Sequence, residues 1–460
     1  MKQKYVGGGL LNKCNSLKLQ KFKVRSSKRK VIIATIILSV LVLTGIYLYS
    51  SFAVFNEEKH FNVINGEIQD PGDIYFAYYV DGEITRSMPS NGIGYTLDTE
   101  KSNCTNGVIP KWDNAGWQFI GDYSNYNATD YTRTRCNLYF KRIDITLTNY
   151  IKNLALYDTT NLSYDETSDN NLRYVGGSPN NYVSVDGELW RIIGVMNNID
   201  DGTGNKEARV KLIRAQNIGG YTWDTSESSV NNGDGVNEWS EADLMKLLNP
   251  GYESETIGGS LYYNAKTGNC YYGQNNGTTA CDFTSNGMKE KLKKMISKAV
   301  WHTGAVNEAN INTMVARDIY NKEHSSETGK ICSGGIHCND AVTRTTTWQG
   351  LVGLINASDY GFAASTNGTL ERGVCQNYPL ISFSNKNSCY TDNWLSTWAW
   401  TMTVASEGSR SYDVIDIKTT TIGHDWVNSP IAIYPVVYLK ANVKITKGVG
   451  TSDIPFEITI

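Results

Sequence analysis

The chain has 460 residues and a formal charge of −3, which combines a basic start with an acidic remainder. Ten of its 43 Lys and Arg lie in residues 1–30 without any Asp or Glu, so the other 430 residues carry 33 basic against 46 acidic side chains. This acidic body offers no basic patch for phosphates, which argues against nucleic acid as a partner. Aromatic residues make up 11% of the chain, a composition that excludes a disordered polypeptide.

Residues 31–49, VIIATIILSVLVLTGIYLY, are uncharged and directly follow the basic segment. As a helix rising ~1.5 Å per residue they span roughly 28 Å, close to the ~30 Å hydrocarbon core of a bilayer. The positive-inside rule predicts a cytoplasmic tail over 1–30, a transmembrane helix over 31–53 and an extracellular remainder. This is the topology of a single-pass cell-membrane protein whose partner is the lipid bilayer. Cleavage after Ala53 is the alternative, although the length of both segments favours a retained anchor.

Residues 54–142 contain short runs of strand-forming residues separated by turn signals, beginning with IYFAYYVDGEI around Asp81-Gly82. Asp-Gly between alternating apolar residues is a strong signal for a two-residue β-hairpin. The repeated pattern predicts a small Ig-like β-sandwich. Residues 143–160 have apolar residues at mixed spacing, and we expect them to form a partly helical connector.

Residues 161–460 are predicted to form one large domain with strands at both ends and helices in the middle. The run YVSVDGELWRIIGVM predicts a second hairpin at Asp186-Gly187. The sequence SEAD from Ser240 fits a capping box, and apolar residues at helical spacing predict helices over 287–300 and about 307–322. This order of elements predicts an α+β fold.

Eight of the nine cysteines follow the apolar run, and Cys14 precedes it. An even number of cysteines in an oxidising compartment predicts disulfides. Eight cysteines allow about a hundred pairings. Sequential pairing is the simplest of them: Cys104–Cys136, Cys270–Cys281, Cys332–Cys338 and Cys375–Cys389. His337 would add a zinc ligand beside Cys338, but the short spacing favours a small disulfide loop.

Four stretches of the large domain, residues 157–195, 347–363, 393–403 and 434–456, include TWQGLVGLINASDYGFA and YPVVYLKANVKI. They resemble a family of uncharacterised surface proteins of Gram-positive bacteria that join an N-terminal membrane segment to a C-terminal domain of unknown function. Tyr434 stands where that family usually has Arg, in a final strand of the type R-P-V-L-Y-L-K. The resemblance implies a mixed α+β domain distantly like the C-type-lectin-like and sulfatase-modifying-factor folds. Such a likeness of folds does not give a function.

Two oxygen-rich loops are candidates for calcium binding. Asn232, Asp234 and Glu241 fall at positions 3, 5 and 12 of an EF-hand-type loop, whose first position holds a valine without a side-chain oxygen. Asp200 and Asp201 precede a glycine in the second loop. Ordinary Asn, Asp and Gly turn chemistry is the favoured interpretation of both loops. The sequence requires no cofactor, and calcium is the one it allows.

Acidic and aromatic residues near the C-terminus are candidates for ligand binding: Asp359, Asp392, Trp394, Trp398, Trp400 and Trp426. Alternation places Trp398 and Trp400 on one face of a strand, which is either core or a stacking platform for a sugar or peptide. The leading prediction is an extracellular ligand-binding or adhesive protein whose unknown ligand is a glycan or a protein. The alternatives are an enzyme that acts on cell wall or glycan, and a structural component of a surface assembly.

Overall fold

The structure is a computed structural model that describes residues 74–89, 94–114, 116–127, 133–225, 235–271, 279–326, 345–365, 373–406 and 413–460. The predicted tail and transmembrane segment, residues 1–53, lie outside these ranges. Among the described residues, no helix has the length and apolar character needed to cross a membrane. The described residues divide into two compact units, those within 74–89 and 96–141 and those within 94–95 and 142–460.

The first unit is built on a parallel pair of strands, β1 (Ile74–Val80) and β7 (Thr134–Arg142). Strand β2 (Glu83–Thr85) is antiparallel to β1 across the Asp81-Gly82 turn, so the first predicted hairpin is confirmed. Both turn residues have positive φ, 52° and 90°, which an Asp-Gly pair tolerates. The other strands are β3 (Tyr95–Leu97), β4 (Asn103–Cys104), β5 (Trp112–Asp113) and β6 (Gln118–Phe119).

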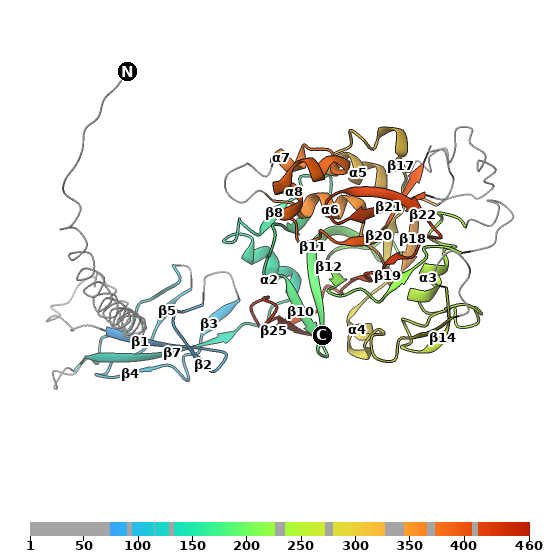
Figure 1. The fold of residues 1–460 in the computed structure, drawn as a ribbon. Coiled ribbons are helices and arrows are strands. Elements are labelled where there is room, and N and C mark those ends of the chain that lie inside the picture. The colour runs from blue at the N-terminus through green and yellow to red at the C-terminus, as the bar shows by residue number, and fades with distance from the viewer. Residues whose placement is uncertain are drawn as a thin grey trace, which may run out of the picture. The chain divides into compact units, whose positions relative to one another are not determined.

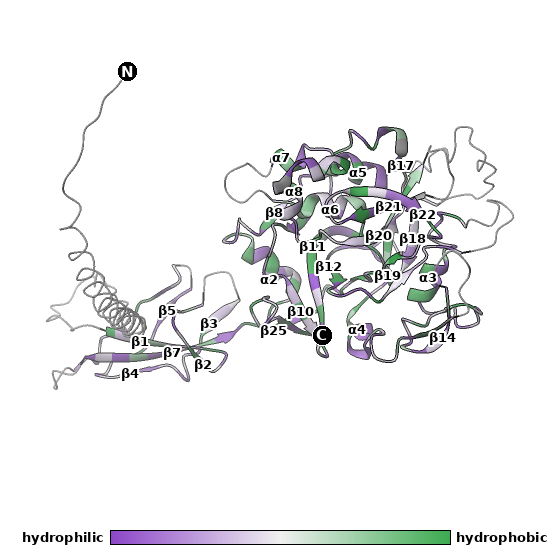
Figure 2. Ribbon diagram, in the orientation of Figure 1, coloured by the Kyte–Doolittle hydropathy of each residue, from purple (hydrophilic) through white to green (hydrophobic). Residues whose placement is uncertain are grey.

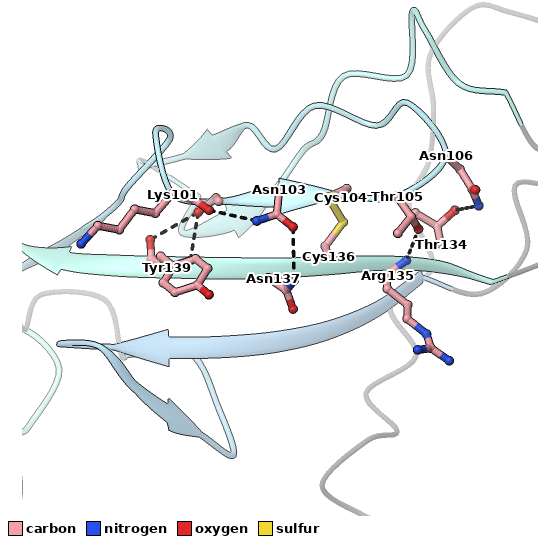
Figure 3. Close-up of a disulfide and its surroundings, with 11 residues drawn as sticks. Lys101, Asn103, Cys104, Thr105, Asn106, Thr134, Arg135, Cys136, Asn137 and Tyr139 are labelled. Atoms are coloured by element: carbon pink, nitrogen blue, oxygen red, sulfur yellow. Dashed lines mark hydrogen bonds between the residues drawn. A yellow bond between two sulfur atoms is a disulfide. The ribbon is translucent and has the colours of Figure 1, made fainter.

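The predicted Ig-like sandwich is wrong. The described strands of the first unit form one five-stranded sheet, ordered β2-β1-β7-β3 with β4 also on β7, and a separate β5–β6 hairpin. An Ig-like sandwich needs two packed antiparallel sheets. Strand β7 instead holds the sheet together, with β1 on one side and the Cys104–Cys136 disulfide joining it to β4 on the other (Figure 3). An Asn137 to Asn103 hydrogen bond of 3.2 Å adjoins that disulfide.

The second unit contains a nine-stranded sheet ordered β19-β24-β12-β11-β10-β26-β25, with β8 and β9 attached to β11. The predicted hairpin at Asp186-Gly187 is confirmed, because it joins β10 to β11. The strands of this sheet are β8 (Leu162–Tyr164), β9 (Leu172–Tyr174), β10 (Tyr182–Val185), β11 (Glu188–Asp200), β12 (Lys206–Arg214), β19 (Val352–Gly353), β24 (Val436–Tyr438), β25 (Lys444–Lys447) and β26 (Phe456–Thr459).

A smaller four-stranded sheet, ordered β17-β20-β21-β22, lies in the same unit (Figure 1). The unit also contains three strand pairs, β13–β23, β14–β15 and β16–β18. Their bounds are β13 (Gly220–Tyr221), β14 (Thr267–Cys270), β15 (Thr279–Asp282), β16 (Ala299–His302), β17 (Val306–Asn307), β18 (Thr347–Gly350), β20 (Trp398–Ser406), β21 (Asp413–Lys418), β22 (Ile422–Trp426) and β23 (Ile431–Ala432).

The described helices of this unit are short. They are α2 (Leu147–Leu154), α3 (Asp243–Leu248), α4 (Glu290–Met295), α5 (Ala316–Glu323), α6 (Ala357–Ala363), α7 (Gly373–Gln376) and α8 (Asn387–Thr391), with the 3-10 helices η2 (Glu308–Asn310) and η3 (Leu380–Asn385). Helix α2 occupies part of the expected connector, and Figure 2 shows hydrophobic and hydrophilic residues along it. Its buried residues include Leu147, Tyr150 and Ile151.

The predicted α+β fold is wrong, because strands dominate where helices were expected. The expected helix over 287–300 shrinks to α4, since Ile296 is already extended and pairs with Leu439. The residues that follow form β16, which pairs with β18. β-Branched residues such as Ile296 and Val300 suit a strand when a partner strand is available. Tertiary pairing therefore overrides the local helical periodicity.

The two other predicted helix features also change. Helix α3 begins at Asp243 with Ala242 as its N-cap and no side-chain cap, so the predicted capping box is wrong. The Ser240 hydroxyl instead donates to Glu238 at 2.7 Å. The helix expected over 307–322 is interrupted, because η2 ends at Asn310 and α5 begins six residues later.

Three of the predicted disulfides are confirmed: Cys104–Cys136, Cys270–Cys281 and Cys375–Cys389. Cys332 and Cys338 lie outside the described residues. Each confirmed bridge closes a local loop, of 32, 11 and 14 residues in sequence separation. The sequential pairing therefore holds wherever the structure describes both cysteines.

Replacing Cys375 and Cys389 together by serine is expected to lower the free energy of unfolding by about 3 kcal/mol. The bridge closes a loop of about fifteen residues, and opening it enlarges the unfolded ensemble. Urea denaturation of the oxidised wild-type and variant chains measures the difference. In a reducing buffer neither chain has this bridge, so the two stabilities should converge. Equal midpoints under oxidising conditions would contradict the prediction.

Candidate functional site

A polar cavity of about 260 Å³ lies within the second unit. Strands β9, β11, β12, β16, β18 and β24 and helices α5 and α6 contribute its walls. Its wall residues are Asp169, Asn171, Arg173, Met196, Asn197, Asn198, Ile199, Asp200, Lys206, Lys211, Val300, Trp301, His302, Tyr320, His324, Thr347, Asn356, Ser358, Asp359 and Tyr438. Elements drawn from residues 169–438 thus meet around one small space.

The floor of the cavity is a buried cluster of two acidic and two basic side chains. Lys211 Nζ lies 2.6 Å from Asp359, and the Arg173 guanidinium contacts both Asp359 and Asp165, the latter at 2.9 Å. Burial acts to raise the pKa of Asp359, but the charges of Lys211 and Arg173 outweigh it and lower that pKa to about 2. Burial lowers the pKa of Lys211, and the charge of Asp359 acts in the opposite direction. With Lys211 protonated beside the ionised Asp359, the two acidic and two basic groups make the floor formally neutral.

Local sequence explains how these side chains reach the floor. On β12, Lys211 alternates with the buried residues Val210 and Leu212, so its side chain points to the opposite face of the sheet. Asp359 stands at the third position of α6, where its carboxylate accepts from the Asn356 amide at 3.0 Å in a capping box. Arg173 lies in the middle of β9.

Lys211 keeps hydrogen-bonding capacity for a ligand. An ammonium has three hydrogens, and Lys211 uses two of them, toward Asp359 and toward Asn356 at 3.1 Å. Its side chain is only 3% exposed, yet it lines the cavity. Tyr438 also lines the cavity, and its hydroxyl has no hydrogen-bond partner within the described ranges. Both groups can bond an atom that enters the cavity.

One wall is a stack of three rings, His302, His324 and Tyr320. The ring centroids of His302 and His324 lie 4.0 Å apart, and those of His324 and Tyr320 lie 3.9 Å apart. The Tyr320 hydroxyl donates to Asp169. Burial lowers the pKa of His302, and burial together with His302 lowers the pKa of His324 to about 4. Both imidazoles are therefore neutral at pH 7.

The hydrogen bonds of His324 define its tautomer. Its Nδ1 lies 2.9 Å from the carbonyl oxygen of Tyr320, which only accepts, so Nδ1 carries the proton. The other ring nitrogen, Nε2, is then an acceptor. His302 has no hydrogen bond on either ring nitrogen within the described part of the chain. The stack therefore presents uncharged nitrogens beside the cavity.

A third buried carboxylate, Glu323, ends α5 behind the floor. It accepts from Thr403 Oγ1 at 2.6 Å, from the Ser358 amide at 3.2 Å and from the Ser358 hydroxyl. Burial raises the pKa of Glu323 to about 7, although these hydrogen bonds act in the opposite direction. Ser358 lines the cavity, so Glu323 supports the floor without itself forming part of the wall.

The candidate calcium residues make turn contacts. Asp200 accepts from the amides of Gly202 and Gly204 at 2.7 and 3.1 Å, and Asp201 accepts from Thr203. Asn232 and Asp234 lie outside the described residues, and Glu241 is exposed. Where side chains are described, no three His, Cys, Asp or Glu come together in a way that could hold a metal ion. Asp200 lies at the cavity wall, and calcium stays a prediction.

The candidate binding residues are divided among separate places. Asp359 lies in the cavity floor, whereas Asp392 is buried and accepts from the Gly177 amide at 2.9 Å. The tryptophans Trp394, Trp398, Trp400 and Trp426 are not cavity residues. Trp394 and Trp400 are buried and donate to the carbonyls of Tyr174 and Tyr221, Trp398 is 53% exposed, and Trp426 packs partly buried against the core.

Several cavity residues were not candidates from the sequence: Lys211, Arg173, His302, His324, Tyr320 and Tyr438. Lys211 carried a usable signal, because a charged residue inside the apolar run of a central strand is expected to have a buried partner. His302 and His324 gave a weaker signal, which is that the chain contains only five histidines. Their separation of 22 positions in sequence gave no indication that their rings would stack.

Comparisons of the chain with models of protein families, with curated proteins and with solved structures find no match. The resemblance to surface proteins of Gram-positive bacteria therefore stays a prediction. The cavity has to be interpreted from its own chemistry. It combines a neutral ion-pair floor, uncharged imidazoles and a buried ammonium with a spare hydrogen, which together suit binding of a polar molecule by hydrogen bonds.

Proposed function

We propose that residues 142–460 form an extracellular ligand-binding domain whose site is the polar cavity. The observation that carries this proposal is Lys211, a buried charged side chain on a central strand with one hydrogen left for a bound molecule. Buried polar groups normally have at least one hydrogen-bond partner, and an ammonium can donate three hydrogen bonds, so the third hydrogen of Lys211 is available to a molecule in the cavity. The Tyr438 hydroxyl and the His302 nitrogens add further groups available to a ligand.

The proposed location rests on sequence and cysteine chemistry. The basic segment and the apolar run 31–49 favour export of the remainder, which stays attached to the lipid bilayer. The three disulfides support an oxidising compartment, because cytosolic proteins rarely keep them. Adhesion is included in this proposal where the ligand is part of a larger glycan or protein.

Binding is favoured over hydrolysis because the carboxylates at the cavity are already engaged. Asp359 is held by two cations and stays ionised down to about pH 2. Asp169 accepts from Tyr320 and from Asn198 at 3.0 Å, and Asp200 accepts from two loop amides. A glycosidase needs one carboxyl that is protonated at working pH and free to reach the substrate. The arrangement thus gives the enzyme alternative less support.

Small polar compounds are expected to raise the melting temperature of the full chain, purified in a detergent without a sugar headgroup. The panel contains uncharged sugars, carboxylate and phosphate anions, and amino acids. A ligand that binds the folded state stabilises it in proportion to the logarithm of its concentration over Kd. His302→Phe keeps the stacked ring but removes both ring nitrogens, so it should reduce the shift produced by any compound that binds here.

Tyr262→Phe is the matched control, because Tyr262 is fully buried, is not a cavity residue and has a hydroxyl without a partner among the described residues. The control should keep the ligand-induced shift of the wild type. A panel without any stabilising compound, or a shift that His302→Phe leaves intact, would remove the cavity as the binding site.

A further inference from the structure

The groups available around the cavity differ in hydrogen-bonding type. Lys211 only donates, Nε2 of His324 only accepts, and the Tyr438 hydroxyl and the neutral His302 ring do both. A carboxylate in the cavity would only accept, and an ammonium would only donate. Hydroxyl groups both donate and accept, so a ligand that carries several of them can satisfy the whole set.

The charges around the cavity disfavour an ionised ligand of either sign. Three carboxylates of the cavity wall, of Asp169, Asp200 and Asp359, are balanced by three cations, of Arg173, Lys206 and Lys211. An anion would therefore meet no surplus of positive charge. A cation at the floor would lie against the ammonium of Lys211. Because an ion buried without a counter-charge is strongly unfavourable, these charges select for an uncharged ligand.

Size and aromatic surface narrow the class further. The cavity, at about 260 Å³, is smaller than the ~300–1,000 Å³ of sites that enclose drug-sized molecules. It has room for one ring-sized group. Trp301 and Tyr438, whose ring centroids lie 4.7 Å apart, and the His302–His324–Tyr320 stack supply aromatic surface against which the apolar edges of such a ring can pack.

We infer that the cavity takes one uncharged, hydroxyl-rich ring, a neutral sugar residue at the end of a glycan, and rejects its acidic and basic counterparts. The inference rests on the proposed function, because it names the ligand class of the same site. Lys211 and Tyr438 bond the sugar oxygens at the floor, and His324 accepts a hydrogen from one of its hydroxyls.

Matched sugars test the class directly. Glucose, galactose and mannose are each compared with their uronate and their 2-amino-2-deoxy form, by calorimetric titration of the full chain in the same detergent. The neutral member of at least one set should bind, and its uronate and amino sugar should bind at least about tenfold more weakly. Affinity for the neutral sugar should change little between 50 and 500 mM NaCl, since screening acts on charges.

Tyr438→Phe should lower the affinity for the neutral sugar by about three- to tenfold, the range expected for the loss of one hydrogen bond. Tyr262→Phe should bind it like the wild type. Tighter binding of a uronate or an amino sugar, a steep dependence on salt, or no binding by any neutral member would overturn the inference. If a charged compound binds and His302→Phe abolishes it, the cavity remains the site and the ligand class alone is wrong. If none of the sugars, carboxylate and phosphate anions, and amino acids binds, the proposed binding function and the neutral-sugar inference are both rejected.

Discussion

Asp359→Asn is expected to lower the free energy of unfolding by about 3–5 kcal/mol. The change leaves Lys211 and Arg173 buried with only Asp165 to balance them. Removing one partner of a buried ion pair leaves the other charge buried without a counter-charge and poorly solvated. Urea denaturation followed by tryptophan fluorescence measures the loss.

A surface pair provides the control for this substitution. Arg317 and Glu166 lie 3.0 Å apart, but their side chains are 49% and 79% exposed. Glu166→Gln is therefore expected to change stability by less than about 1 kcal/mol. The double variant Asp359→Asn with Lys211→Met removes one charge of each sign, so it should recover part of the stability lost in Asp359→Asn. Equal stabilities for Asp359→Asn and wild type would contradict the buried cluster.

Local sequence signals predicted local structure well. Asp81-Gly82 and Asp186-Gly187 mark two hairpins because an Asp-Gly pair tolerates the positive φ that such turns require. The disulfides could also be predicted, because each confirmed bridge joins one cysteine to the next cysteine in the sequence. In these cases the residues that decide the structure lie within a few tens of positions of one another.

The fold class failed where the outcome depended on distant partners. Strands β1 and β7 pair in parallel across more than fifty residues, and short-range alternation cannot distinguish that from a sandwich of antiparallel strands. Ile296 bridges Leu439, more than 140 positions away, and so ends α4. Helical periodicity in a short segment is a weak preference that such pairing overrides.

The candidate site was predictable only in part. Asp359 was a candidate for binding and Asp200 for calcium, and both lie at the cavity. The tryptophan cluster suggested a platform, but the indoles of Trp394 and Trp400 face the backbone carbonyls of other strands in the core. The cavity exists because residues from β9, β12, β16, α5 and α6 converge, and no spacing in the sequence encodes that meeting.

Glu323→Gln is expected to stabilise the chain increasingly as the pH rises from about 4.5 to 7. The pKa of Glu323 is raised by burial from its ordinary value of 4.5 to about 7 in the folded chain. Between these values the unfolded chain has lost the proton while the folded chain keeps it, so wild-type stability falls as the pH rises. At ~1.4 kcal/mol per pKa unit, the fall approaches about 3 kcal/mol by pH 8.

The glutamine has no charge to bury, and its amide oxygen and nitrogen can still bond the hydroxyls of Ser358 and Thr403. The stabilities of the two chains should therefore lie closest near pH 4.5 and differ most above pH 7, in denaturation curves measured across that range. Glu290→Gln is the control of opposite sign. The hydrogen bond from Lys293 lowers the pKa of this exposed glutamate, so the ionised carboxylate stabilises the folded state. Removing that carboxylate should therefore slightly destabilise the folded state at neutral pH. A difference between Glu323→Gln and wild type that stays constant with pH would show that Glu323 is ionised in the folded chain throughout.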